Sequence, residues 1–177
     1  MKELDQIILK SYKDRNTINL IYGLSGTYKT SFIRYVASLL NKHVIILDFD
    51  NNSWFNDVHA AAVIENQLIP IENKIIMLEC YNNLLFEKHP KSFQKLFQKL
   101  LNHCLSKNCI LFVEHYRIPY KEVGTNRFDT VINMVKENKS WFERLFRLDR
   151  ITIRFMKNRY HKRIEIKINP KNLFRSL

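Results

Sequence analysis

Glycine, proline and cysteine are all scarce in this 177-residue chain, which contains three, four and three of them respectively. No internal repeat and no tract rich in glycine, proline or serine divides the sequence, so a boundary between two domains is not indicated. Apolar residues make up 46% of the chain, which is enough for one hydrophobic core at this length. We therefore expect a single domain over residues 1–177.

Cysteine and histidine are not arranged as metal ligands. The three cysteines, Cys80, Cys104 and Cys109, are odd in number and form no C-x-x-C pair, and the six histidines never pair at ligand spacing. A signal peptide and an 18-residue apolar run are also absent from the sequence. We expect a cytoplasmic protein with reduced thiols, without zinc and without a membrane partner.

Positive charge dominates the composition, with a formal net charge of +12. Residues 139–177 hold twelve Lys or Arg and three acidic residues, a net charge of +9 in that segment alone. Such density favours a polyanion, and nucleic acid is the usual one, because neutralising phosphates releases counterions whatever the base sequence. A solvated surface and an acidic partner protein are the alternatives.

Hydrophobic periodicity predicts an alternation of strands and helices. The predicted strands are 18–22, 43–49, 74–80, 109–113, 150–156 and 163–168, and the predicted helices are 29–40, 54–67 and 91–106. Residues 128–146 are predicted to be helical or irregular. Apolar strands alternating with helices indicate an α/β fold with a mainly parallel twisted sheet covered on both faces, and the last two strands form an antiparallel hairpin at one edge.

Two of the three glycines lie in one segment directly after the first predicted strand. That segment reads Gly23-Leu24-Ser25-Gly26-Thr27-Tyr28-Lys29-Thr30-Ser31. A glycine loop ending in Lys-Thr, between a strand and an amphipathic helix, is the pattern of a P-loop, whose backbone N–H groups and helix N-terminus bind phosphates. Lys29 would reach the β- and γ-phosphates of ATP, and Thr30 would ligate Mg²⁺. An ordinary strand-to-helix turn is the alternative.

Tyr28 departs from this pattern, which has glycine just before the lysine. Tyrosine still supplies a backbone N–H group, but its Cβ atom penalises any conformation with positive φ that the loop requires.

Three further segments resemble those of the RecA-like ATPases, in particular the small archaeal RadB-like and KaiC-like branch. Residues 46–50, Ile-Leu-Asp-Phe-Asp, end the second strand where that family places a water-activating glutamate, and Asp50 takes that position. Residues 74–80 resemble the Walker B strand, so the resemblance implies that Glu79 holds Mg²⁺ beside Thr30. A strand-end glutamate that only reaches solvent is the alternative for Glu79.

The resemblance extends to the second half of the chain. Glu114 and His115 take the places of a polar pair that senses the γ-phosphate, so His115 is a candidate catalytic residue, although a strand-end histidine can also be purely structural. Lys157 and Arg159 resemble a Lys-x-Arg finger that reaches the nucleotide of a neighbouring subunit, which implies a homo-oligomer or a recombinase partner. A chance K-x-R in a lysine-rich segment is the alternative.

Loops after the third and fourth strands bind DNA in that family. In this chain these loops correspond to residues 81–90 and 116–128, and the second of them mixes aromatic with basic residues, as suits single strands. The candidate DNA-binding residues are Arg117, Lys121, Arg127, Lys162 and Arg163.

Another family shares the N-terminal third. Gly23-Leu24-Ser25-Gly26 and residues 47–51 resemble segments of adenylylsulfate kinases, but no arginine-rich lid follows. The leading hypothesis is an ATP- and DNA-binding RecA/RadB-like accessory factor in recombination or repair, with weak or absent ATP hydrolysis. A P-loop small-molecule kinase and a non-enzymatic DNA- or partner-binding module with a vestigial nucleotide site are the alternatives.

Overall fold

The computed structural model describes residues 3–48, 72–80, 90–116, 128–137, 150–157 and 162–170. The predicted helix at 54–67 lies outside these residues. None of the helices in these ranges combines the length and the apolar character that a membrane span requires.

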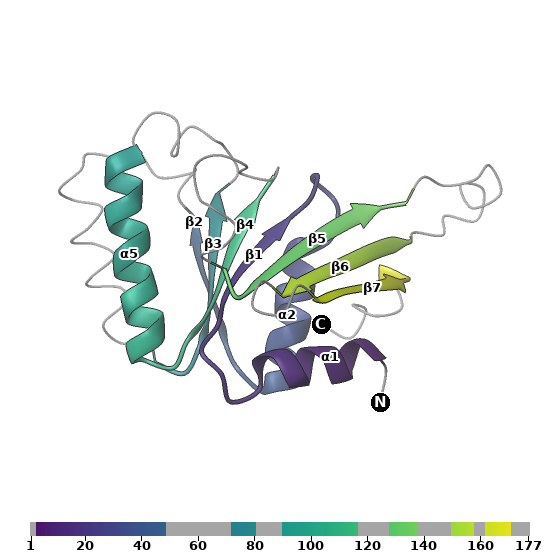
Figure 1. Ribbon diagram of the computed structural model, residues 1–177, viewed down its shortest axis with the longest axis horizontal. Helices are drawn as coiled ribbons and strands as arrows, with labels where there is room; N and C mark the ends of the chain where they lie inside the picture. Colours follow the sequence, from purple (N-terminus) through teal and green to yellow (C-terminus); the bar gives the residue numbers. More distant parts are fainter. Residues whose placement is uncertain are drawn as a thin grey trace.

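A seven-stranded sheet forms the centre of the molecule (Figure 1), with the strand order β2-β3-β4-β1-β5-β6-β7. The strands are β1 Ile18–Tyr22, β2 Val44–Asp48, β3 Ile75–Cys80, β4 Ile110–His115, β5 Thr130–Lys136, β6 Ile151–Lys157 and β7 Lys162–Ile168. The pairs from β2 to β5 are parallel, and β6 and β7 are antiparallel to their neighbours. The predicted α/β class, the mainly parallel sheet and the antiparallel hairpin at one edge are confirmed.

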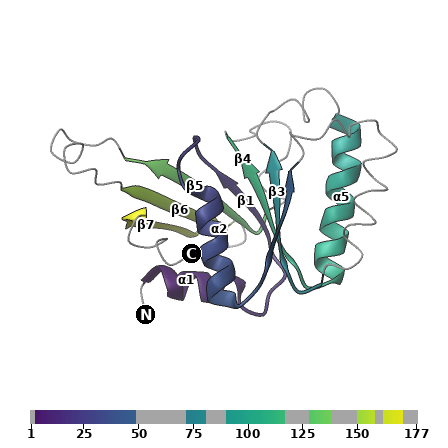
Figure 2. The same ribbon diagram turned by 180° about the vertical axis from the view of Figure 1, so that it is seen from behind.

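Helices cover both faces of this sheet. The helix α5, Pro90–Ser106, lies on one face, and α1, Glu3–Tyr12, and α2, Lys29–Leu40, lie on the other (Figures 1 and 2). The C-terminal half of α5 buries Leu100 and Cys104 against strand residues that include Leu111 and Val113. Spacings of three and four residues place such side chains on one helical face, which is why the periodicity predicted this helix.

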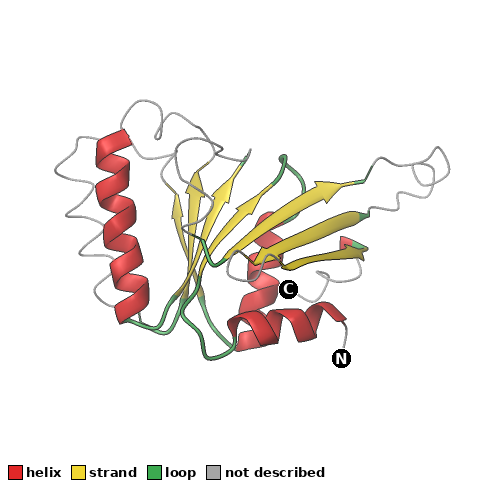
Figure 3. Ribbon diagram, in the orientation of Figure 1, coloured by secondary structure: helices red, strands yellow, loops and turns green. Residues whose placement is uncertain are grey.

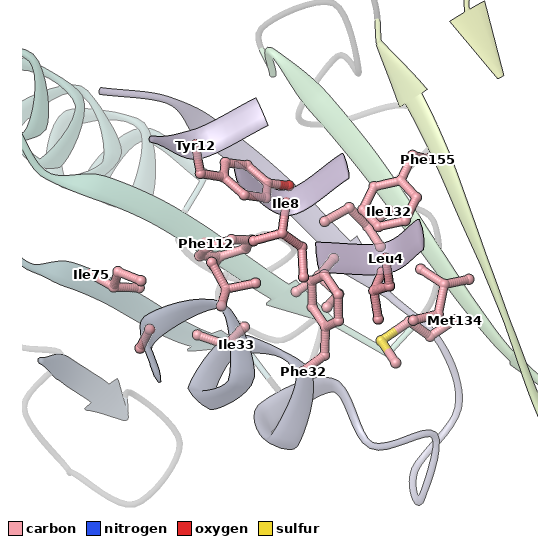
Figure 4. Packing of buried hydrophobic residues seen from close by; sticks show 14 of the residues in the cluster. Leu4, Ile8, Tyr12, Phe32, Ile33, Ile75, Phe112, Ile132, Met134 and Phe155 are labelled. Atoms are coloured by element: carbon pink, nitrogen blue, oxygen red, sulfur yellow. The ribbon is translucent and has the colours of Figure 1, made fainter. Parts of the chain in front are cut away.

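The larger core cluster lies between the sheet and the pair α1 and α2 (Figure 4). Phe32, Ile33 and Val36 of α2 are fully buried there. The Phe32 ring lies 6.0 Å from the Phe155 ring of β6, measured between centroids. Burying side chains of this size stabilises the fold by about 1.5–3 kcal/mol each, so the position of α2 against the sheet is fixed by its apolar face.

The prediction for residues 128–146 was wrong where β5 forms. Phe128, Val131, Ile132 and Val135 follow a spacing in the sequence that is also typical of a helix. Residues 130–136 are a strand between β1 and β6, and Val131 and Ile132 are both buried although they point to opposite faces. A strand covered on both faces is apolar on both sides, so period-two alternation is lost.

The helix α1 was not predicted either. Leu4, Ile8 and Tyr12 are buried at spacings of four residues, so an amphipathic signal was present in the sequence. The Tyr12 ring packs edge to face on Phe112 of β4 with centroids 5.6 Å apart, which ties α1 to the centre of the sheet.

Candidate nucleotide-binding site

The candidate site lies at the carboxyl edge of the parallel strands. The loop from β1 to α2 sits at the edge toward which the parallel arrows point in Figure 3. Because β4 pairs directly with β1, the last residues of β4 lie beside the start of the loop. The backbone N–H of Gly23 donates to the carbonyl oxygen of His115 over 3.3 Å, which joins the loop to the end of β4.

Both loop glycines occupy positions where a side chain is unfavourable. A Cβ atom on Gly23 would lie 2.3 Å from the carbonyl oxygen of Met134 in β5, so only glycine allows this close approach. Gly26 has a φ of +74°, in the left-handed region that glycine adopts without penalty. The loop therefore has a tightly specified backbone.

Tyr28 adopts a left-handed conformation, with φ 64° and ψ 30°, at the start of α2. A residue with a Cβ atom pays roughly 1–2 kcal/mol for this conformation. The carbonyl oxygen of Tyr28 accepts the first helical hydrogen bond of α2, from the Phe32 N–H over 2.9 Å. The loop therefore does have positive φ at this position, and tyrosine bears a conformational cost that glycine would not.

Lys29 is turned inward, and its side chain is only 6% exposed. Its Nζ donates to the carbonyl oxygens of Gly23 and Leu24 over 2.8 and 3.1 Å. The third contact is an ion pair with the Glu114 Oε1 atom at 3.3 Å. Since an ammonium group has three hydrogen-bond donors, these three acceptors engage all of them.

Glu114 is the last residue but one of β4, which is buried throughout, and its side chain is also 6% exposed. Burial raises the pKa of the Glu114 carboxyl, and the Lys29 ammonium and the Thr30 hydroxyl oppose that shift. Its Oε2 atom is buried without a hydrogen-bond partner among the described residues. In the register of the sheet Glu79 of β3 lies directly beside Glu114, so the two side chains leave the sheet on the same face.

His115 lies on the opposite face of the sheet from Glu114, because successive strand residues alternate in direction. Its neighbour in the register is Tyr22, which belongs to the core on the α5 side. His115 is buried, with 3% of the residue exposed. The structure therefore brings Glu114, and not the side chain of His115, to Lys29.

Lys157, the described residue of the candidate finger, lies at the amino edge of the parallel strands. Lys157 is the last residue of β6 and pairs with Thr130, the first residue of β5. Thr130 in turn pairs with Asn19 of β1, three residues before the end of that strand and the start of the loop. The register also pairs Lys157 with Lys162, at the amino edge of the parallel strands. A residue placed there is remote from the β1–α2 loop of its own chain.

Several candidate residues lie outside the described part of the chain. These are Asp50, Arg117, Lys121, Arg127 and Arg159. For Lys157, Lys162 and Arg163 the backbone is described, within β6 and β7. Their proposed roles in catalysis and DNA binding stay predictions.

The contact that sequence reasoning missed is the ion pair between Lys29 and Glu114. Glu114 had been placed only as a member of a phosphate-sensing pair. A glutamate that directly follows four buried apolar residues was the available signal, but its partner follows only from β4 lying beside β1.

No protein family profile matches the chain, and no curated protein matches it. The chain is similar to solved structures, including the following two. The crystal structure of the RadB recombinase superposes with a TM-score of 0.70 at 12% identity, over 98% of this chain and 95% of that one. A KaiC-like protein, PH0186 from the hyperthermophilic archaeon Pyrococcus horikoshii OT3, gives a TM-score of 0.57 at 12% identity, over 86% of this chain and 84% of that one.

Identity this low carries the fold and not the activity. The match with RadB covers nearly the full length of both chains, whereas the local likeness to adenylylsulfate kinases is confined to the N-terminal third. The chain has a RecA-like fold of the kind seen in RadB and KaiC-like proteins.

Proposed function

We propose that this chain is a divergent RecA/RadB-like protein that binds ATP with Mg²⁺ and associates with DNA, as an accessory factor in recombination or repair. It acts as one RecA-like domain over residues 1–177 in the cytoplasm, where the thiols of Cys104 and Cys109, both buried, stay reduced. The observation that carries the proposal is the position of Lys29. Its side chain points into the β1–α2 loop, in which Gly26 and Tyr28 have left-handed backbone conformations, at the N-terminus of α2.

The loop suits a polyphosphate in its backbone as well as in its charge. The first intrahelical hydrogen bond of α2 is donated by Phe32, so the N–H groups of Lys29, Thr30 and Ser31 precede the helical ladder. Such N–H groups, together with the helix dipole, favour an anion at this end. Lys29 would bind the β- and γ-phosphates once it leaves its internal partners.

Thr30 and Glu79 are the proposed Mg²⁺ ligands, and the chemistry of the site fits a hard cation. The hydroxyl of Thr30 and the carboxylates of Glu79 and Glu114 supply oxygen donors, and the buried Oε2 atom of Glu114 has no hydrogen-bond partner among the described residues. Mg²⁺ prefers oxygen ligands and keeps several of its waters. Bound with the nucleotide, it would supply charge neutralisation between the phosphates.

Weak or absent hydrolysis follows from the residues at the catalytic positions. Asp50 stands where the related family has glutamate, and a carboxylate about one methylene shorter is withdrawn from an attacking water. The side chain of His115 faces the α5 side of the sheet. We infer that any general-base step by Asp50 is slow.

DNA association rests on the charge of residues 139–177, which is +9. Phosphate neutralisation by Lys and Arg gives affinity without base specificity. The proposed DNA contacts are Arg117, Lys121, Arg127, Lys162 and Arg163. Because Lys157 lies at the sheet edge opposite the loop, a finger formed by Lys157 and Arg159 would serve a neighbouring subunit or a recombinase partner.

Calorimetric titration with ATP and Mg²⁺ tests the proposal. We expect binding in the wild type and its loss in Lys29→Ala, because the only side-chain cation of the loop is removed. Lys107→Ala is the matched control, since Lys107 is a half-exposed lysine that pairs with Glu72 at the opposite edge of the sheet. No binding to the wild type at millimolar ATP would reject the assignment.

A non-enzymatic DNA- or partner-binding module with a vestigial nucleotide site is the second candidate. The observation that favours it is the ion pair between Lys29 and Glu114, which engages the phosphate-binding lysine internally. DNA binding that persists in a wild type unable to bind ATP would support this candidate over the first.

A further inference from the structure

The lysine of the β1–α2 loop is already paired with an anion of the protein itself, the Glu114 carboxylate of β4. The three acceptors around the Lys29 ammonium group are two loop carbonyls and one carboxylate oxygen, and none of them is replaced by solvent, since the side chain is 6% exposed. A phosphate that approaches Lys29 must take over at least one of these positions. The Glu114 contact is the one that carries charge.

A phosphate bound there would also meet the negative charge of Glu114. The carboxylate is attached to β4, beside β1, so the backbone cannot move it away without breaking the parallel ladder. It is buried, so water screens it poorly. Two like charges held this close inside a protein cost several kcal/mol, which is enough to oppose a metal-free polyphosphate.

We propose that Glu114 makes the site selective for the divalent-cation complex of a nucleoside polyphosphate over the metal-free anion. This inference rests on the proposed nucleotide function and names the residue that sets its ligand form. A divalent cation places positive charge between the phosphate and Glu114. It also gives the Oε2 atom a partner, which it lacks among the described residues.

The arrangement around Glu114 supports a role toward the cation. Glu114 is 4% exposed and its Oε2 atom is buried, so bulk water does not solvate this oxygen. Glu79 lies beside Glu114 in the register, and the Thr30 hydroxyl lies close enough to stabilise the Glu114 carboxylate. Glu114 thus has an oxygen-bearing neighbour on β3 in the register and another on α2, and as the partner of Lys29 it would link the lysine to the cation.

The test is the ratio of two dissociation constants for ATP, one with excess EDTA and one with excess Mg²⁺, in the wild type and in Glu114→Gln. In the wild type we expect Mg²⁺ to tighten binding by about 100-fold or more. In Glu114→Gln, metal-free ATP should bind at least about tenfold more tightly than in the wild type, because the repelling charge is gone. The gain from Mg²⁺ should fall to about tenfold or less in the variant.

Two further variants separate charge from shape. Glu114→Asp keeps the charge and is expected to retain strong selectivity for the Mg²⁺ complex. Glu72→Gln makes the same charge change at an exposed carboxylate at the opposite edge of the sheet, and its ratio should match the wild type. Thermal unfolding midpoints establish that each variant is folded.

Each outcome decides the matter. Equal ratios in the wild type and Glu114→Gln would overturn the selectivity role and leave the nucleotide site standing. If Glu114→Gln does not fold, the wild type alone decides, because metal-free ATP that binds as tightly as the Mg²⁺ complex contradicts the inference. Absence of ATP binding in every protein under both conditions overturns the proposed function, and this inference with it.

Discussion

The ion pair between Lys29 and Glu114 is expected to be asymmetric in its contribution to stability. At 3.3 Å, with both side chains 6% exposed, the gross attraction is on the order of 5 kcal/mol at an effective dielectric constant near 20. Desolvation of the two charges offsets most of it, so the informative quantity is the effect of removing one partner. The two partners are not equally supported by their surroundings.

Lys29→Met leaves the buried Glu114 carboxylate without its cation. The Thr30 hydroxyl then still stabilises the negative charge by a hydrogen bond. We expect the free energy of unfolding to fall by roughly 3–5 kcal/mol. Glu114→Gln leaves Lys29 with the carbonyl oxygens of Gly23 and Leu24 and an amide oxygen in place of the carboxylate. The expected loss is smaller, roughly 1–3 kcal/mol.

Urea unfolding followed by circular dichroism, without nucleotide, measures these losses. The double variant Lys29→Met/Glu114→Gln should lose less unfolding free energy than the sum of the two single losses, by roughly 0.5–3 kcal/mol. Once one partner has been replaced, the second substitution removes a buried charge that no longer has a counter-charge. Lys107→Met, at an exposed pair with Glu72, is the control and should cost no more than about 1 kcal/mol. Additive losses, or a Lys29→Met cost below that of Glu114→Gln, would refute the reasoning.

Three more predictions concern the loop and the basic segment. Tyr28→Gly should raise ATP affinity or turnover, because glycine adopts the left-handed conformation that costs tyrosine roughly 1–2 kcal/mol; unchanged values in titration and turnover assays would show that Tyr28 is no obstacle. Gly23→Ala should destabilise the fold by more than about 1 kcal/mol in thermal or urea unfolding, because its Cβ would lie 2.3 Å from the Met134 carbonyl oxygen, whereas Gly26→Ala meets no atom within 4 Å and pays only for its φ. DNA binding should weaken with salt: the logarithm of the affinity should fall against the logarithm of the salt concentration with a slope of about −3 to −5 for ~4–6 phosphate contacts. Replacing Lys157, Arg159, Lys162 and Arg163 with alanine should make this slope shallower by about one unit per lost contact. A flat salt response would leave the charge unexplained by nucleic acid, and reduced ATP turnover with unchanged DNA affinity would indicate a finger.

Local patterns were enough to predict the position of the β1–α2 loop. The strand, the glycine spacing and the amphipathic helix that follows are all contained in residues 18–40, and each has a short-range physical cause. The terminal hairpin was equally accessible, because β6 and β7 lie toward one edge of the sheet and keep the alternation of half-buried strands.

The features that local sequence patterns could not predict depend on the order of the strands in the sheet. β5 is buried on both faces between β1 and β6, so its apolar residues lose the period of two and imitate a helix. The Lys29 and Glu114 contact joins residues 85 positions apart and depends on β4 pairing with β1. No short-range propensity encodes that adjacency, and the same adjacency placed His115 on the face away from Lys29.

A crystal structure with a non-hydrolysable ATP analogue and Mg²⁺ tests the central claim most directly. The account predicts the β- and γ-phosphates at the N-terminus of α2, with the Nζ atom of Lys29 on a phosphate oxygen and Glu114 facing the cation. A Tyr28 ring in the phosphate position, with Lys29 still paired to Glu114 at saturating analogue, would contradict it.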